Sequence, residues 1–264
     1  MSPTRSGINV IYSSDSLPEL KSSYLICGFP GSGYVGKIAV DHLIEELHAE
    51  HLADIYSTSF PPQVLIRSDG TADLMKNTIF YSKGSSGTNL LLLTGDSQPA
   101  NPDSEYLLAE EIMDIATKFN TNHVFTLAAY ITGVFVEKPR IFGTATDIDT
   151  IRSFRESNIS TMDGGSITGM NGLIIGIAKL RGIRGTCLLG ETSGYVVDAK
   201  ASKSILETLL QIVGINIDMK NLEKRAKDTE MLIQTIEQQM AGRVGQPQQQ
   251  QGGTTRPSAM GYIS

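Results

Sequence analysis

The chain has 264 residues, of which 40% are hydrophobic and 19% charged, so it is long enough to bury a full core in one large domain. Its net charge is −6 and it has no basic stripe interleaved with aromatic residues, which argues against nucleic acid and anionic membrane surfaces as partners. No apolar run could span a bilayer and no secretory signal opens the chain, so a cytoplasmic protein is expected.

Short runs rich in Ile, Val, Leu, Phe and Tyr recur along the chain and predict β-strands. Some of them, such as residues 90–93, are apolar at every position, which is typical of parallel strands buried on both faces. The predicted strands are residues 8–12, 24–27, 54–58, 64–67, 78–81, 89–94, 123–128 and 185–189.

Between these strands, apolar residues repeat with the period of an amphipathic helix over residues 34–48 and 104–119. The second helix is preceded by a start signal, Asn101-Pro102-Asp103-Ser104. The alternation of strands and helices predicts an α/β fold, in which a mostly parallel sheet is flanked by helices on both faces.

The stretch GFPGSGYVGK, residues 28–37, directly follows a predicted strand and matches parts of two nucleotide-binding signatures. Gly31, Gly33 and Gly36 spell the dinucleotide fingerprint GxGxxG, and Gly31, Gly36 and Lys37 spell most of a P-loop. A nucleotide- or nucleoside-binding enzyme that uses this loop is therefore one reading of the chain.

Residues around the loop weaken both nucleotide readings. The P-loop needs a Ser or Thr after its lysine to ligate magnesium, and the chain has Ile38 there. The dinucleotide fold needs an acidic residue at the carboxyl end of the second strand, to bind the ribose hydroxyl. Asp54 lies at about the right distance along the chain, but it is the first residue of its predicted strand. The enzyme reading is kept as the alternative.

Cysteine and histidine give no strong catalytic or metal signal. Cys27 and Cys187 lie inside apolar runs without a CxxC motif, which indicates small buried residues. His42, His48 and His51 cluster on or just after one predicted helix, but without an HExxH motif they are interpreted as solvated side chains rather than zinc ligands.

Glycine is concentrated between residues 163 and 194, which indicates close backbone packing or tight turns. Glu191 in this segment follows a predicted strand, where it fits either a general base or, as we favour, the cap of a neighbouring helix. Asp198 is expected to cap a helix that reaches about Val213, with Gly214 as its stop.

A further helix is predicted from Asp218, and its apolar residues form a heptad seam about three repeats long. Three heptads are marginal alone, so the seam is expected to pack either against another subunit or on its own body, and both readings stay open. The predicted oligomerisation residues are Leu222, Ala226, Thr229, Ile233, Ile236 and Met240.

Residues 242–259 have almost no apolar side chains and are predicted to be a flexible tether. An apolar and aromatic tip, Met260-Gly261-Tyr262-Ile263-Ser264, follows this tether and is typical of a docking peptide, although an unselected frayed terminus has the same pattern. The chain is therefore divided into an α/β domain, a heptad helix and a tail, at residues 1–217, 218–241 and 242–264.

Three stretches together resemble the proteasome assembly chaperone family, in the form of its archaeal single-gene members. They are CGFPGSGYVGKIAVDHLIEEL, GMNGLIIGIAKLRGIRGTCLLGETSGY and DAKASKSILETLLQIVGINIDMKNLEKRA. The resemblance covers roughly residues 7–235, and its most specific parts are the glycine-rich start of the first stretch and the LLGET segment.

The resemblance implies an α/β fold similar to that of nucleoside phosphorylases, and a protein that is not an enzyme and holds no cofactor. It implies a scaffold for assembly of the 20S proteasome core that works without ATP, binds proteasome α subunits, and associates with itself or with a paralogue. Gly28, Gly31, Gly33 and Gly36 would then let the strand turn tightly into a closely packed helix, with Pro30 stiffening the turn and no phosphate required.

The tail departs from the family pattern. Some archaeal members resemble proteasome activators in ending with a hydrophobic residue, a tyrosine and one last residue, which enter pockets between α subunits. Here Tyr262 is third from the end, preceded by Gly261 and followed by Ile263 and Ser264. This offset moves the carboxylate by about 3.3 Å, enough to misplace a contact with lysine. Docking through Met260, Tyr262, Ile263 and Ser264 is therefore a hypothesis.

Overall fold

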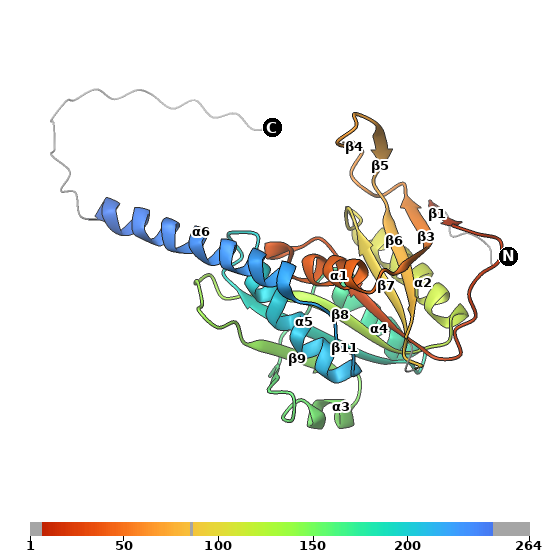
Figure 1. The fold of residues 1–264 in the computed structure, drawn as a ribbon. Helices are drawn as coiled ribbons and strands as arrows, with labels where there is room; N and C mark the ends of the chain where they lie inside the picture. Colours follow the sequence, from red (N-terminus) through yellow and green to blue (C-terminus); the bar gives the residue numbers. More distant parts are fainter. Residues whose placement is uncertain (1–6, 85–86, 245–264) are drawn as a thin grey trace, which may run out of the picture.

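A nine-stranded sheet with helices on both faces forms the centre of the molecule (Figure 1). The structure, a computed structural model, describes residues 7–84 and 87–244, with side chains as far as residue 235. In sheet order the strands are β1 (Ile8–Tyr12), β3 (Glu50–Ser57), β6 (Asn77–Lys83), β7 (Asn89–Gly95), β2 (Ser23–Gly28), β8 (Thr121–Ile131), β11 (Arg184–Thr192), β9 (Ile141–Ala145) and β10 (Ser160–Thr161).

The four central strands, β7, β2, β8 and β11, are parallel, as the predicted fold class requires. The flanks are mixed: β1, β3, β6 and β9 form antiparallel pairs, and β10 pairs with β9 in parallel. Antiparallel pairing follows where successive strands, such as β6 and β7, are joined without a crossover helix. The α/β class is confirmed, with a parallel core and antiparallel edges.

Two apolar cores lie on the two faces of the sheet. Along β2, Leu25 and Cys27 point into one core and Ile26 into the other, as the alternation of a strand requires. The first core is covered by α2 (Pro102–Lys118) and α4 (Met170–Leu180), and the second by α1 (Val35–Glu46) and α5 (Ala199–Val213).

The predicted helix signals are confirmed. The side chain of Asn101 accepts a hydrogen bond from the Ser104 amide at 3.0 Å, and Asp198 caps α5 by accepting from the Ala201 amide at 2.9 Å. Gly214 ends α5 in the left-handed conformation, with φ of 69°.

The last helix, α6 (Lys220–Val244), packs on α5, and its later turns extend past the sheet (Figure 1). Its start is tied to α1, because Nε2 of His42 lies 2.9 Å from the backbone oxygen of Asp218. The prediction of a solvated His42 is therefore wrong: its side chain is buried on the inner stripe of α1, among apolar neighbours.

Several short elements were not predicted, because runs this short carry no hydrophobic period. They include β9 and β10, the turn η1 (Ser32–Tyr34) and the helix α3 (Ile148–Ser153). A predicted strand, β4 (Val64–Ile66), pairs with the unpredicted β5 (Ala72–Leu74) in a hairpin that projects from the body (Figure 1).

Both cysteines are buried, as predicted, and neither forms a disulfide. Burial raises the pKa of the Cys187 thiol to about 12 and raises that of Cys27 as well, so both thiols stay protonated at neutral pH. They behave as small apolar side chains of the core.

Candidate interaction surfaces

The glycine turn joins β2 to α1 at a distance that leaves no room for side chains at two positions. A Cβ on Gly36 would lie 1.9 Å from the backbone oxygen of Leu127 on β8, and one on Gly28 would lie 2.3 Å from the oxygen of Gly36. Gly33 has φ of +63°, and its oxygen accepts a hydrogen bond from the Asp198 amide at 2.8 Å. These glycines allow α1 to lie directly on the central strands.

The outer part of the turn is held by one glutamine. Nε2 of Gln98 donates to the oxygen of Pro30 at 2.7 Å, while its Oε1 accepts from the amide of Met170 at 3.1 Å. Gly31 lies in open space, since a Cβ there would meet no atom within 4 Å. The turn is thereby tied to the start of α4.

Lys37, the lysine of the P-loop pattern, is engaged by side chains of the protein itself. Its Nζ lies 3.0 Å from Oδ2 of Asp41 and donates to the hydroxyl of Thr94 at 3.1 Å, and that hydroxyl donates to Asp41 at 2.6 Å. Ile38, at the magnesium-ligand position, packs against the second core. Lys37 thus fastens α1 to the end of β7.

Exposed apolar side chains gather around the carboxyl ends of β2, β8 and β11, beside the glycine turn. Single exposed apolar residues are common on proteins, but a cluster from three separate loops is a candidate interaction surface. We call this cluster the carboxyl-end face and define it by Tyr34, Ile131, Val134, Tyr195 and Val197.

Direct contacts join two loops of the carboxyl-end face, the one after β8 and the one after β11. The Thr132 amide donates to the oxygen of Thr192 at 3.0 Å, which joins the end of β8 to the end of β11. The rings of Phe135 and Tyr195 lie edge to face with centroids 6.4 Å apart. A Cβ on Gly194 would lie only 3.1 Å from the side chain of Ile131, so these loops are in close contact.

Tyr34 is the most constrained residue of this face. It precedes α1 with φ of 53°, a left-handed conformation that is uncommon for residues other than glycine. Its side chain is 46% exposed and its helix receives no side-chain cap there. A strained and exposed aromatic residue points to a function outside the folded chain.

An ion pair between the buried Glu191 and the exposed Arg140 holds the loop between β8 and β9. The carboxylate of Glu191 accepts from Nε and Nη2 of Arg140, both at 2.9 Å, and from the Arg140 amide at 3.2 Å. These bonds lower the pKa of Glu191. Within the described part of the chain Glu191 caps no helix, contrary to the favoured prediction, and its pairing keeps it ionised rather than poised as a base.

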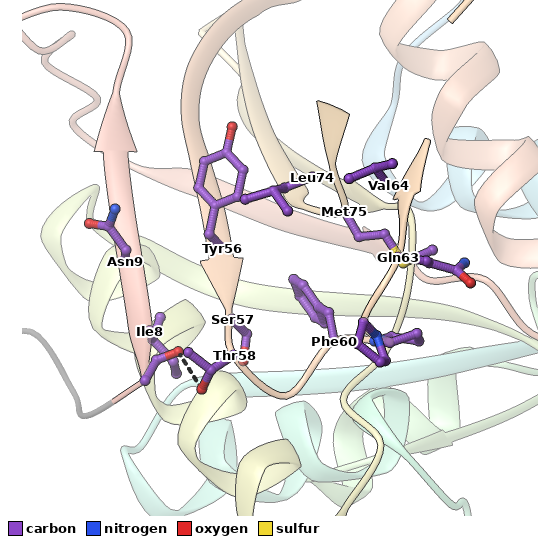
Figure 2. Close-up of a pocket in the computed structure, with 13 residues that line it drawn as sticks. Ile8, Asn9, Tyr56, Ser57, Thr58, Phe60, Gln63, Val64, Leu74 and Met75 are labelled. Atoms are coloured by element: carbon purple, nitrogen blue, oxygen red, sulfur yellow. Dashed lines mark hydrogen bonds between the residues drawn. The ribbon is translucent and has the colours of Figure 1, made fainter. Parts of the chain in front are cut away.

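A second apolar surface lies between the sheet edge at β1 and the projecting hairpin. Figure 2 shows the side chains of this hairpin groove, which has a volume of about 810 Å³. The strand β1 is an edge strand, so one side of its backbone is available for pairing. The apolar lining of the hairpin groove includes Ile8, Tyr56, Phe60, Val64, Leu74 and Met75.

The described residues hold neither a metal-binding cluster nor a membrane-spanning helix. No group of three or more His, Cys, Asp or Glu side chains there has the arrangement of a metal site. In the same ranges, no helix is long and apolar enough to cross a membrane.

Comparison with known proteins identifies the family. The model of the PAC2 family matches residues 25–237, which include the glycine turn and all residues of the carboxyl-end face. The chain belongs to the PAC2 family. The resemblance to proteasome assembly chaperones that the sequence indicated is thereby confirmed.

Solved structures from Pyrococcus furiosus resemble this PAC2 protein closely. PbaB, described as an archaeal proteasome activator, is 36% identical with a TM-score of 0.81, over 88% of this chain and 99% of PbaB. PbaA, described as an archaeal homologue of proteasome-assembly chaperone, is 27% identical with a TM-score of 0.72, over 90% of this chain and 94% of PbaA.

A relative in Methanocaldococcus jannaschii, the uncharacterized protein MJ1210, is 37% identical over 218 residues. The match covers 82% of this chain and 84% of MJ1210, so the two proteins share most of their length.

The heptad seam of this PAC2 protein is partly used within the chain. Leu222, Ala226, Thr229 and Ile233 are all buried without a second chain, and Leu222 belongs to the second core. The seam therefore closes the body as far as Ile233, while the side chains of Ile236 and Met240 lie outside those described. Exposed apolar residues on this helix are instead Met231 and Leu232.

The predicted docking tip, Met260, Tyr262, Ile263 and Ser264, lies outside the described residues. The carboxyl-end face was not predicted as a surface, although a signal for it exists. Exposed aromatic residues such as Tyr34 and Tyr195 directly follow strands of a parallel sheet, where binding residues of α/β proteins gather.

Proposed function

We propose that this PAC2 protein is an ATP-independent scaffold for assembly of the 20S proteasome core, which binds proteasome α subunits as a homo-oligomer. The similarity to PbaB, at 36% identity over 99% of that chain, is the observation that supports this proposal most strongly. The similarity to PbaA supports it independently, because PbaA is described as a homologue of proteasome-assembly chaperone.

The carboxyl-end face is the surface that best fits capture of another polypeptide. It presents two tyrosines and three aliphatic side chains, and tyrosine is among the residues that carry most binding energy at protein interfaces. The Glu191–Arg140 pair and the contact between Gly33 and Asp198 hold its loops in place before binding. A preorganised surface loses less entropy on association.

The geometry of the glycine turn supports a protein that is not an enzyme. Gly28 and Gly36 are required by close packing, and Lys37 is bonded to Asp41 and Thr94 rather than turned to a ligand. A thermal-shift assay with ATP, NAD and nucleosides tests the enzyme alternative, since a ligand at 100 times its Kd adds about 2.7 kcal/mol. No shift is expected, and a rise of several degrees would favour the enzyme.

The tail supplies a second contact in this proposal. Met260, Tyr262 and Ile263 provide apolar anchors on a polar tether, so they add to binding by the body through effective concentration. Deletion of residues 242–264 is expected to weaken the association with α subunits, as measured by surface-immobilised binding. Unchanged affinity would refute the role of the tail.

A pull-down from native lysate of the source organism, with the C-terminus intact, tests the proposed function. Mass spectrometry should show α subunits enriched with the wild-type bait and depleted with Tyr195→Ser/Val197→Ser. The matched control is Ile66→Ser/Leu74→Ser, which alters two equally exposed apolar residues of the hairpin. If only the control variant recovers fewer α subunits, the hairpin groove rather than the carboxyl-end face is the contact surface. Absence of α subunits from every pull-down would contradict the proposal.

A further inference from the structure

A small, partly open cavity lies at the opposite end of the sheet from the carboxyl-end face. It has a volume of about 190 Å³ and is bounded by the amino ends of β2, β8 and β11, by α3 and by the end of α5. The lining residues that matter for its chemistry are Tyr24, His123, Phe125, Phe154, Arg184 and Thr186.

His123 lines this cavity and is only half satisfied by the protein. Its side chain is more than nine-tenths buried, and its Nε2 lies 2.8 Å from the hydroxyl of Thr186. Nδ1 has no hydrogen-bond partner among the residues that the structure describes. Burial, reinforced by the charge of Arg184, lowers the pKa of His123 to about 4, so the ring is neutral at physiological pH. Nδ1 is therefore available for a hydrogen bond to a polar atom of a molecule bound in the cavity.

The remaining wall of the cavity is part aromatic, from Tyr24, Phe125 and Phe154, and part polar, from the hydroxyl side chains of Thr150, Ser153 and Ser157. The rings of His123 and Phe125 are stacked with centroids 4.2 Å apart, and the ring of Tyr24 stands edge-on to both, at 6.2 and 5.9 Å. Aromatic groups pack well in such offset and edge-to-face arrangements. An apolar cavity of about 150 Å³ holds benzene, so this one has room for a single six-membered ring with one substituent.

The charged group at the cavity is Arg184. Its side chain forms no ion pair or hydrogen bond within the described ranges, although its charge reaches His123. The neighbouring acid, Asp147, is engaged at the start of α3, where it accepts from the amide and the hydroxyl of Thr150. An unpaired guanidinium recognises a carboxylate through two parallel hydrogen bonds.

We propose that this cavity binds a small monocyclic aromatic acid. Its ring lies against Tyr24, His123 and Phe125, its carboxylate pairs with Arg184, and Nδ1 of His123 hydrogen-bonds to the ligand. The site is separate from the proposed function, because it lies at the other end of the sheet from the surface assigned to partner binding. Its failure would leave the scaffold proposal intact.

Isothermal titration of the full-length protein with sodium benzoate tests the proposal, with benzamide as the uncharged isostere. Benzoate is expected to bind saturably at one site per chain, and benzamide at least tenfold more weakly. Arg184→Gln should weaken benzoate to the level of benzamide, since Arg184 is exposed and unpaired. Ile212→Trp, which fills the mouth of the cavity, should abolish binding of both.

Nitrogen-15 spectra of the His123 ring give a second readout that needs no variant. Addition of benzoate should shift the Nδ1 resonance with the same midpoint as the titration. The proposal is overturned if benzoate shows no saturable binding, if benzamide binds equally well, or if neither variant alters benzoate binding. It is also overturned if inorganic phosphate displaces benzoate, because the site would then recognise any anion.

Discussion

The space around each glycine of the turn determines whether alanine can replace it without loss of stability. Gly36→Ala gains about 1 kcal/mol of helix propensity but places a Cβ 1.9 Å from the Leu127 backbone oxygen, which only a shift of α1 or β8 can relieve. Overpacking of this kind lowers the free energy of unfolding by about 1–3 kcal/mol. We expect the larger value here, because the added Cβ meets backbone atoms, which cannot move aside as a flexible side chain can. Thermal unfolding should show a melting temperature several degrees lower.

Gly31→Ala is the matched control, because Gly31 has an extended backbone with φ of −167° and open space around it. Its melting temperature should stay at the wild-type value. Equal melting temperatures for the two variants would show that the close approach of α1 is not what Gly36 provides.

The Glu191–Arg140 pair makes stability depend on pH. The bonds from Arg140 hold the pKa of Glu191 below its ordinary value of 4.5. A lowered pKa in the folded state adds stability above pH 4.5, and this stability is lost as pH falls through the folded pKa. Glu191→Gln should therefore be less stable than wild type at pH 7, with a difference that shrinks below about pH 4.

Urea denaturation at pH 7 and at pH 3 measures this effect, and Arg140→Gln should reproduce it. A stability difference between wild type and Glu191→Gln that stays constant from pH 7 to pH 3 would mean that the pair does not stabilise the loop.

At the scale of elements, the two sides of α6 have different roles. Ile233 is buried against the body while Leu232, one residue away, is half exposed. Ile233→Asp should lower the free energy of unfolding by at least about 2 kcal/mol, because it removes apolar packing and buries a charge. Leu232→Asp should leave stability unchanged and reduce the mass of the proposed homo-oligomer measured by light scattering.

If Leu232→Asp leaves the mass of the oligomer unchanged, self-association uses another surface. Wild-type stability of Ile233→Asp would show that this part of α6 is not docked on the body in solution. The two variants therefore separate packing of the seam on the body from self-association through the exposed side of α6.

At the scale of the whole molecule, features that depend on local sequence were predicted, whereas features that depend on contacts between distant residues were not. The parallel core followed from continuous apolar runs, and the caps at Asn101 and Asp198 followed from residue type alone. The glycine turn was ambiguous, because the pattern GxGxxG is the same for a phosphate and for close packing. The position of Leu127, far along the chain, shows that Gly36 is required by close packing.

The carboxyl-end face was not predicted, for a similar reason. Its residues, Tyr34, Ile131 and Tyr195 among them, come from three loops that become neighbours only once β2, β8 and β11 are in register. His42 was misread because its helix face, rather than its residue type, determines its burial. The division into domains at residues 217 and 241 remains a prediction.

Reconstitution with purified proteasome α subunits in nucleotide-free buffer tests the central claim most directly. Size-exclusion chromatography with light scattering should detect a complex heavier than either component, formed without ATP and lost with Tyr195→Ser/Val197→Ser. Separate elution of the two proteins, or a complex that appears only when nucleotide is added, would contradict the account.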